Sequence, residues 1–368
     1  MKKKINILLA APPEWLGGGI ASAVLGIRAA LLCLSAEITV REMVYVKPKG
    51  KLLGINKFIL EIYDLFAFVV KIIIFKMDVV HIQSTFHYKN INVLRDSIYL
   101  WATRLTGKKF ILHAHGGEWD KVNEWSKGWQ YYIKLYLTSC NRIIVTSSNE
   151  QQVLEYIYKD KVKVSTIYNP VVSPIPIPAQ LDFSKFQPIK KIIFASRLIE
   201  EKGVLDVVHA TSHLMHRNDF HVLIYGKGIL FNKAQSLISS LNLQDKITLK
   251  SEVSLPQLIE QYLQCDMFLF PSYYGEGFPM ALFYAVSCGL PIITTKIRAV
   301  SDFLSEPENC LWVEPKNPRI LAEKIGFLLD HPDLVTPMRK NNKKLSLSFS
   351  PEKISHEFLT LYQKLISQ

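Results

Sequence analysis

The sequence has few cysteines, and their arrangement points to neither a disulfide framework nor a metal site. The five cysteines are odd in number and widely spaced, none belongs to a C-x-x-C pair, and none lies near a histidine cluster. Disulfide frameworks and structural zinc sites need paired or regularly spaced cysteines. We therefore expect buried, reduced thiols in a cytosolic protein at Cys33, Cys140, Cys265, Cys288 and Cys310.

A segment able to span a membrane is also missing. The longest apolar stretch, residues 58–75, is interrupted by Glu61, Asp64 and Lys71. Charged side chains are costly inside a bilayer, so we reject a membrane span there. The shorter apolar run at 5–11 is followed by two prolines and a glycine run, which predicts a first β-strand and a Gly-rich loop rather than a signal peptide.

Acidic residues are scarce in the first half of the chain. The formal net charge is +12, and residues 1–175 hold 23 Lys/Arg against 13 Asp/Glu. A basic half suits an acidic partner such as nucleic acid, anionic lipid or a phosphate-bearing acceptor, although general surface basicity is the alternative. No nucleic-acid module is present, and aromatic residues do not alternate with the basic ones as in a stacking platform, so we expect no nucleic-acid partner.

Apolar stretches and helical patterns alternate through the 368 residues, which exceed the usual length of a single-core domain. A proline-rich stretch at 170–178 cannot hold a helix and predicts an interdomain linker. Two βαβ series imply two doubly wound parallel sheets. We expect strands at 5–10, 38–45, 79–83, 110–113, 143–146 and 164–168, and again at 191–196, 221–225, 247–249, 267–270, 291–294 and 310–313.

The stretch 57–76 predicts a helix with an unusual distribution of charge. Lys57, Glu61, Asp64 and Lys71 fall on one narrow stripe, and nearly every other position is apolar. Such a helix is either buried on most sides or rests on a membrane surface. We predict the buried helix, preceding the strand at 79–83, and keep the membrane surface as the alternative.

Two segments of the second half carry side chains suited to binding a phosphorylated ligand. At 195–203 a strand end delivers Arg197 and Lys202 to one spot, where two fixed cations can grip a diphosphate. About eighty residues later, Glu276 stands on a Gly-rich loop directly before a short apolar helix, whose N-terminus favours anions. Taken alone, each segment has a plainer interpretation: Arg197 and Lys202 as ordinary surface cations, and Glu276 as an exposed loop glutamate.

These segments occur in the order of a known family. The loop that begins Glu276-Gly277-Phe278-Pro279 resembles the donor-binding pattern E-G-F-P-x-x-L-x-E of retaining glycosyltransferase family 4 (glycosyl transferases group 1), although the second glutamate is Tyr284 here. Residues 195–203 resemble that family's G-R-L-x-x-x-K-G signature. The turns after other strands also match: Gly17-Gly18-Gly19, His115-Gly116, Gly226-Lys227-Gly228, and Ser251 in place of a usual glycine.

The resemblance, over about residues 5–330, implies the GT-B fold: α/β, with two Rossmann-like domains facing a central cleft. It implies an acceptor-side domain at 1–172 and a nucleotide-sugar-binding domain at 173–349, with a C-terminal helix at 350–368 that packs back on the first domain.

The implied activity is a retaining hexosyltransferase that moves a sugar from a nucleoside diphosphate sugar to a hydroxyl of a lipid-linked or surface-polysaccharide precursor. By resemblance, Arg197 and Lys202 stabilise the leaving diphosphate, Glu276 orients the sugar and His115 contacts it; His113 is expected to point the other way and to be structural. The chain has no D-x-D motif, so we expect neither metal nor cofactor. Further implied donor contacts are Gly18, Gly19, Gly226, Ser251, Gly277, Phe278, Pro279 and Tyr284.

We expect a cytoplasmic protein, with peripheral contact to the anionic inner face of the cell membrane. Two alternatives stay open. One is a Rossmann-sheet epimerase or dehydrogenase, although no G-x-G-x-x-G fingerprint follows the first strand. The other is a non-catalytic GT-B-like subunit or scaffold with weakened donor binding, which Tyr284 favours.

Overall fold

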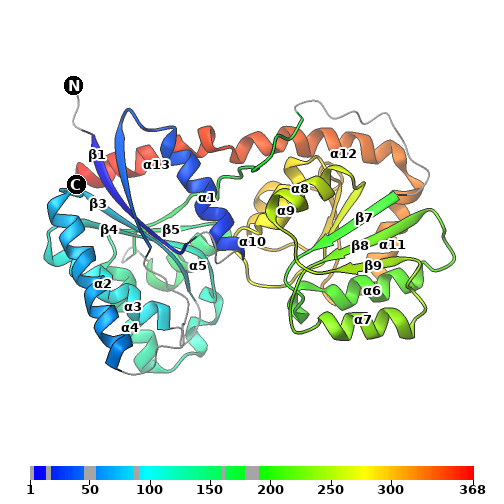
Figure 1. Ribbon diagram of the computed structural model, residues 1–368, viewed down its shortest axis with the longest axis horizontal. Helices are drawn as coiled ribbons and strands as arrows, with labels where there is room; N and C mark the ends of the chain where they lie inside the picture. Colours follow the sequence, from blue (N-terminus) through cyan, green and yellow to red (C-terminus); the bar gives the residue numbers. More distant parts are fainter. Residues whose placement is uncertain (1–3, 14–17, 45–54, 87–90, 160–161, 179–189) are drawn as a thin grey trace. The chain divides into compact units, whose positions relative to one another are not determined.

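The computed structural model describes residues 4–13, 18–44, 55–86, 91–159, 162–178 and 190–368. The chain divides into two compact units, both shown in Figure 1. The first comprises Met1–Val172, Gly275–Phe278 and Phe349–Gln368; the second comprises Ser173–Tyr274 and Pro279–Ser348. Gly17 of the predicted Gly-rich loop and the side chain of Lys57 lie outside the described residues.

The first unit is built on a parallel sheet of six strands in the order β2-β1-β3-β4-β5-β6. The order reverses at β1, which lies between β2 and β3, as expected of a doubly wound sheet. Each predicted strand of this half is present: β1 (Ile5–Ala11), β2 (Ile38–Val44), β3 (Val79–Phe86), β4 (Lys109–Gly117), β5 (Arg142–Val145) and β6 (Val164–Thr166).

Both faces of the first sheet are covered by helices. Because side chains alternate along a strand, Leu8 of β1 points to one core while Ile7 points to the other. The core around Leu8 packs against α2 (Ile55–Ile74), α3 (Ile91–Leu105), α4 (Lys127–Ser139) and α5 (Ser148–Tyr158). The core around Ile7 packs against α1 (Gly18–Leu32) and the C-terminal helix α13 (Pro351–Ile366), which lie together in Figure 1.

The second unit repeats the plan with a parallel sheet in the order β12-β11-β10-β7-β8-β9. Its strands are β7 (Lys190–Ala195), β8 (Phe220–Tyr225), β9 (Ile247–Lys250), β10 (Met267–Phe270), β11 (Ile292–Thr294) and β12 (Cys310–Trp312). Its helices are α6 (Val204–His213), α7 (Phe231–Ser240), α8 (Leu255–Leu263), α9 (Met280–Ser287), α10 (Arg298–Phe303), α11 (Pro318–Asp330) and α12 (Pro332–Leu345). The predicted fold class, two doubly wound parallel sheets, is confirmed.

The expectation that the helix at 57–76 is buried on most sides is wrong. Phe68 and Ile72 of α2 are fully buried against the sheet, but Ile62, Phe66 and Ile73 are more than half exposed. Among the side chains of this helix that the structure describes, those on one side are buried, and the excess of apolar residues faces outward. None of the described helices is long and apolar enough to cross a membrane.

The five cysteines are free thiols, and four of them are buried as expected; Cys33 is exposed.

Candidate functional site

The structure brings Arg197 and Lys202 together in the second unit, as the motif predicts. The guanidinium carbon of Arg197 and the Nζ atom of Lys202 each lie 4.9 Å from the centre of the Tyr274 ring. Arg197 is exposed just after β7, whereas Lys202, 5.2 Å from the Phe270 ring as well, is 2% exposed. Two cations beside one ring at the end of a parallel strand suit an anionic ligand, because each can donate a charge-assisted hydrogen bond to it.

The backbone around Lys202 explains why a glycine must follow it. Gly203 has φ of +76°, and a Cβ there would lie 2.7 Å from the carbonyl oxygen of Pro271. The backbone N–H of Tyr273 donates to the carbonyl of Glu201 at 2.9 Å, and the Ser272 hydroxyl donates to the same carbonyl at 3.2 Å. These hydrogen bonds hold the segment 271–274 against the turn that contains Lys202. The Tyr274 ring therefore lies next to both cations.

The turn after β8 lies against the same strand end. A Cβ on Gly226 would fall 2.0 Å from the carbonyl oxygen of Ser196, and one on Gly228 would fall 2.3 Å from that of Leu198. The N–H of Leu198 donates to the carbonyl of Lys227 at 2.9 Å. Only glycine permits this close approach, which places the predicted Gly226 beside the Arg197 segment.

Ser251 and Tyr284 have different surroundings. Ser251 is exposed directly after β9, the strand paired with β8, so it stands at the same sheet edge as Gly226. Tyr284 lies within α9 and is only 2% exposed. The helix follows Pro279, its N-cap residue, and ends before Gly289, which has φ of +71°. The expected glycine stop is therefore present.

By its contacts, the loop Gly275–Phe278 belongs to the first unit. A Cβ on Gly116, at the end of β4, would lie 3.0 Å from the backbone nitrogen of Gly277. A Cβ on Gly277 would lie 2.0 Å from Oγ1 of Thr146 and 2.6 Å from a carboxylate oxygen of Glu150. Within this unit, Glu276 is half-buried on a loop seated beside the turn that follows His115.

Glu150 is the buried acid beneath that loop. Its carboxylate accepts hydrogen bonds from the Trp119 indole at 3.0 Å and from the Ser147 hydroxyl at 3.1 Å. It lies in the first turn of α5 and is 1% exposed. A carboxylate near a helix N-terminus is stabilised by the free backbone N–H groups there.

His115 is half-buried, and its Nε2 lies 2.7 Å from Oε1 of Gln83 on β3. The expectation that His113 points away from it is wrong: the two rings stack with centroids 4.4 Å apart. Residues two apart on a strand point to the same side, which the prediction overlooked. The structural role expected of His113 fits its position, since it is buried with Nδ1 3.2 Å from Nε2 of His81.

His81, His113 and His115 are neutral at neutral pH, because their pKa values are lowered. Burial lowers the pKa of His115 to about 4, against a smaller opposing effect of a hydrogen bond with Asn169. Burial, and then repulsion from His115, lowers the pKa of His81 to about 3. Burial, and then repulsion from His115 and His81, lowers the pKa of His113 as well. At neutral pH, His115 can therefore donate or accept a hydrogen bond without carrying charge.

The remaining predicted positions, Gly18 and Gly19, form the first turn of α1. Gly18 has φ of +81°, and no atom lies within 4 Å of a Cβ built on either glycine. The space around this helix start is open in the part of the chain that the structure describes. Among the described residues no three His, Cys, Asp or Glu side chains gather to hold a metal ion.

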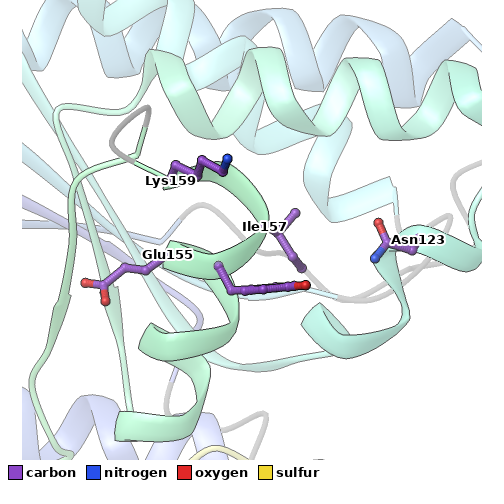
Figure 2. Close-up of a pocket in the computed structure, with 5 residues that line it drawn as sticks. Asn123, Glu155, Ile157 and Lys159 are labelled. Carbon is purple, nitrogen blue, oxygen red and sulfur yellow. The ribbon is translucent and has the colours of Figure 1, made fainter.

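A separate cavity of about 470 Å³ lies in the first unit between the 3₁₀ helix Trp119–Glu124 and α5. Figure 2 shows Asn123 on one side and Ile157 on the other, with the Glu155 carboxylate directed away from them. Glu155 accepts a hydrogen bond from Gln151 at 2.8 Å. None of the predicted site residues lines this cavity, and its polar groups do not converge, so we assign it no chemistry.

Sequence reasoning missed three contributors: Tyr274, which faces both cations; Glu150, under the acidic loop; and Gln83, beside His115. The sequence carries a signal for two of them, because Tyr274 immediately precedes the acidic loop and Gln83 is a polar residue in an apolar strand. Glu150 carries no such signal, because an acid in the first turn of a helix is commonplace.

Comparison with known proteins bears on the whole arrangement. Residues 182–345 match the sequence model of the family described as Glycosyl transferases group 1. An uncharacterised glycosyltransferase of Methanocaldococcus jannaschii is 27% identical over 255 residues, which is 69% of this chain and 68% of the relative. The N,N'-diacetylbacillosaminyl-diphospho-undecaprenol alpha-1,3-N-acetylgalactosaminyltransferase of Campylobacter jejuni is 27% identical over 175 residues, 48% of this chain and 45% of that enzyme.

Solved structures agree in fold. A glycosyltransferase from Rickettsia africae matches with a TM-score of 0.74 at 21% identity and 99% coverage of both chains. Anabaena HepE in complex with UDP and glucose matches with a TM-score of 0.69 at 16% identity, covering 98% of this chain and 99% of that one. Residues 182–345 are thus similar to the glycosyl transferases group 1, and the fold of the chain is the GT-B fold of the solved glycosyltransferases.

Proposed function

We propose that the protein is a retaining hexosyltransferase that moves a sugar from a nucleoside diphosphate sugar to a hydroxyl of a lipid-linked or surface-polysaccharide precursor. The relatives support this class of acceptor: one acts on a diphospho-undecaprenol substrate, and another is named a putative colanic acid biosynthesis glycosyltransferase of Escherichia coli. A uridine diphosphate donor is the first to test, because HepE was solved with UDP and glucose.

The observation that carries the proposal is the pair of cations on Tyr274. Arg197 and Lys202 approach one ring from the end of a parallel strand, and Lys202 is almost fully buried. A diphosphate bound there would receive two charge-assisted interactions in a site partly shielded from water. Charge accumulates on the diphosphate as the bond to the sugar breaks, so these interactions strengthen in the transition state.

The reaction then needs no protein nucleophile. The bond between the anomeric carbon and the leaving phosphate oxygen breaks, and the acceptor hydroxyl forms its bond on the same face of the sugar. Because the new bond forms on the face that the leaving group occupied, the configuration is retained. The hydroxyl proton passes to the leaving phosphate oxygen, so charge is balanced. Glu276 accepts hydrogen bonds from sugar hydroxyls and orients the ring, and neutral His115 contacts the sugar.

We further propose that transfer is independent of metal, because Arg197 and Lys202 supply the positive charge that a divalent ion would bring to a diphosphate. We place the protein in the cytoplasm, in peripheral contact with the anionic inner face of the membrane, where a lipid-linked acceptor would be found. The competing function is a GT-B scaffold with weakened donor binding, favoured by Tyr284 at the position of a family glutamate.

Donor binding tests the proposal directly. We would measure thermal unfolding with a panel of nucleoside diphosphate sugars, beginning with UDP-glucose and UDP-N-acetylgalactosamine, with and without EDTA. A ligand at 100 times its dissociation constant adds about 2.7 kcal/mol to stability, which is a readily measured shift in Tm. The stabilising donor should then be consumed when acceptor is added. Stabilisation by no donor at millimolar concentration would favour the scaffold function.

A further inference from the structure

The outward face of α2 is apolar. Ile62, Tyr63, Phe66, Ile73 and Ile74 are 52%, 64%, 67%, 60% and 66% exposed. Helical spacing puts them on the arc opposite the buried Phe68 and Ile72, whereas Asp64 and Lys71 flank the buried side. A surface helix of a soluble protein normally has the reverse arrangement, with its polar side chains outward.

The neighbouring helix α3 repeats this inversion. Leu94, Ile98, Trp101 and Leu105 follow the spacing of one helix face, and they are 42%, 52%, 43% and 89% exposed. Three polar residues of the helix, Asp96, Ser97 and Thr103, are buried instead. Asp96 is 2% exposed and bonded to Arg95 and to the Ser84 hydroxyl, and Thr103 is fully buried.

The two faces form one surface. The rings of Phe68 on α2 and Tyr99 on α3 meet edge to face at 4.7 Å, so the helices lie side by side on one face of the sheet. Their exposed arcs therefore both point away from it. The apolar surface of α2 and α3 comprises Ile62, Tyr63, Phe66, Ile73, Ile74, Leu94, Ile98, Trp101 and Leu105.

Exposed basic side chains lie on α3 and on α4, which is bonded to it. Arg104 lies over the exposed Trp101 ring at 5.6 Å and donates to the backbone of Ser139 on α4, which adds exposed Lys127 and Lys134. Of the described side chains on α2, α3 and α4, the exposed charged ones are these three bases and a single acid, Glu61. Contiguous apolar surface of this kind marks an interaction site.

We propose that the apolar surface of α2 and α3 rests on an anionic lipid bilayer, with Arg104, Lys127 and Lys134 on the lipid headgroups. A bilayer interface accepts a broad apolar face bordered by cations, and it favours tryptophan and tyrosine at headgroup depth. Trp101 beside Arg104 supplies both features at one place. The inference deepens the proposed function, on which it rests for its lipid-linked acceptor, but binding to vesicles requires no sugar donor.

Vesicle flotation of the full chain tests this surface. The protein should float with phosphatidylcholine vesicles containing phosphatidylglycerol, less at high salt, and poorly with phosphatidylcholine alone. The double variant Ile98→Asp/Trp101→Asp should lower the partition coefficient at least about tenfold. Arg104→Glu should lower it about fivefold or more, since each basic residue near an anionic leaflet contributes on the order of 1 kcal/mol.

Leu347→Asp is the matched control, because Leu347 is 68% exposed in the second unit and stands on neither helix. It should float as the unchanged protein does. Circular dichroism and donor-induced stabilisation should be the same in all variants, which separates a failure of this surface from a failure of the proposed function. Equal recovery with both vesicle types would overturn the proposal. The proposal would also be overturned if the protein formed an oligomer that did not float and if Ile98→Asp/Trp101→Asp converted this oligomer to monomer. The surface would then join copies of the chain.

Discussion

At the scale of residues, Lys202 is almost fully buried, with its Nζ atom beside the Phe270 and Tyr274 rings. Replacing it with methionine keeps most of its length and removes the charge, and thermal unfolding without donor measures what the charge itself contributes to stability. Loss of a charge-assisted interaction with the diphosphate costs about 1.5–3 kcal/mol, or roughly 10-fold to 150-fold in donor affinity. Calorimetric titration of donor into Lys202→Met checks this.

Lys316 provides the matched control for that variant. Its Nζ lies 4.9 Å from the Tyr273 ring and 3.9 Å from Glu200, but its side chain is 63% exposed. Lys316→Met should leave donor affinity unchanged. Equal losses in both variants would point to a general electrostatic effect rather than a diphosphate clamp.

Tyr284 stands where the resembling family has a glutamate that accepts hydrogen bonds from the ribose. A phenol offers fewer acceptor sites than a carboxylate, so donor binding should be weaker by about 1–2 kcal/mol, or roughly 5-fold to 30-fold. We expect Tyr284→Glu to improve donor affinity several-fold. Because Tyr284 is 2% exposed, the new carboxylate should also lower Tm in the absence of donor.

Tyr284→Glu is expected to raise donor affinity and to lower Tm, so its two effects can be told apart. Tyr284→Phe keeps the volume and removes the hydroxyl, so it separates packing from hydrogen bonding. A Tyr284→Glu variant that loses stability but gains no donor affinity would show that this position does not reach the nucleotide. If the unchanged protein also binds no nucleoside diphosphate sugar at millimolar concentration, the non-catalytic scaffold is the better account.

At the scale of elements, the C-terminal helix α13 is attached to the first sheet by a buried hydrogen bond. The Tyr362 hydroxyl lies 2.8 Å from Nδ1 of His81 on β3, and both side chains are fully buried. Tyr362→Phe leaves a buried histidine nitrogen without that partner, which should cost about 1–3 kcal/mol of unfolding free energy. Urea denaturation and hydrogen exchange of α13 amides check the prediction.

The control is Tyr156→Phe, at a tyrosine that is 83% exposed on α5 of the same unit. It should change neither the denaturation midpoint nor exchange in α13. Faster exchange spread evenly over the first unit, rather than concentrated in α13, would contradict a local attachment.

At the scale of the whole molecule, the buried histidines should make the protein sensitive to acid. The pKa of His81 is about 3 in the folded protein, against an ordinary value of 6.5 when unfolded. Below pH 6.5 the unfolded chain therefore binds a proton at His81, whereas the folded protein binds it only near pH 3. The free energy of unfolding should therefore decrease as the pH is lowered through this window, by about 1.4 kcal/mol per pH unit for His81. Above the window it should not depend on the charge of His81.

Unfolding free energies measured between pH 5 and pH 7 test this dependence. His81→Gln cannot titrate, so the slope should decrease by about one proton near pH 5 and by less toward pH 7, whatever the variant's absolute stability. His213→Gln, at an exposed histidine of the second unit, controls for the substitution itself. An unchanged slope in His81→Gln would mean that the acid sensitivity arises elsewhere.

Local patterns in the sequence were sufficient for the fold. Every predicted strand is present, because apolar runs bounded by helical patterns leave few other arrangements than two doubly wound sheets. The approach of Lys202 and Arg197 was also predictable, since both follow one strand end by a few residues. The apolar excess of residues 57–76 was visible too, but which side of that helix faces outward depends on its neighbours.

The sequence by itself determined the order of elements, the two-sheet class and the pair of cations, because each follows from spacing along a few residues. Only the tertiary structure decided the contacts between distant residues: Glu150 beneath the acidic loop, His81 bonded to Tyr362, and α2 with its apolar side outward. Alternation along a strand or helix specifies that a residue faces one side. What lies on that side depends on packing between elements far apart in the chain, which no local pattern encodes.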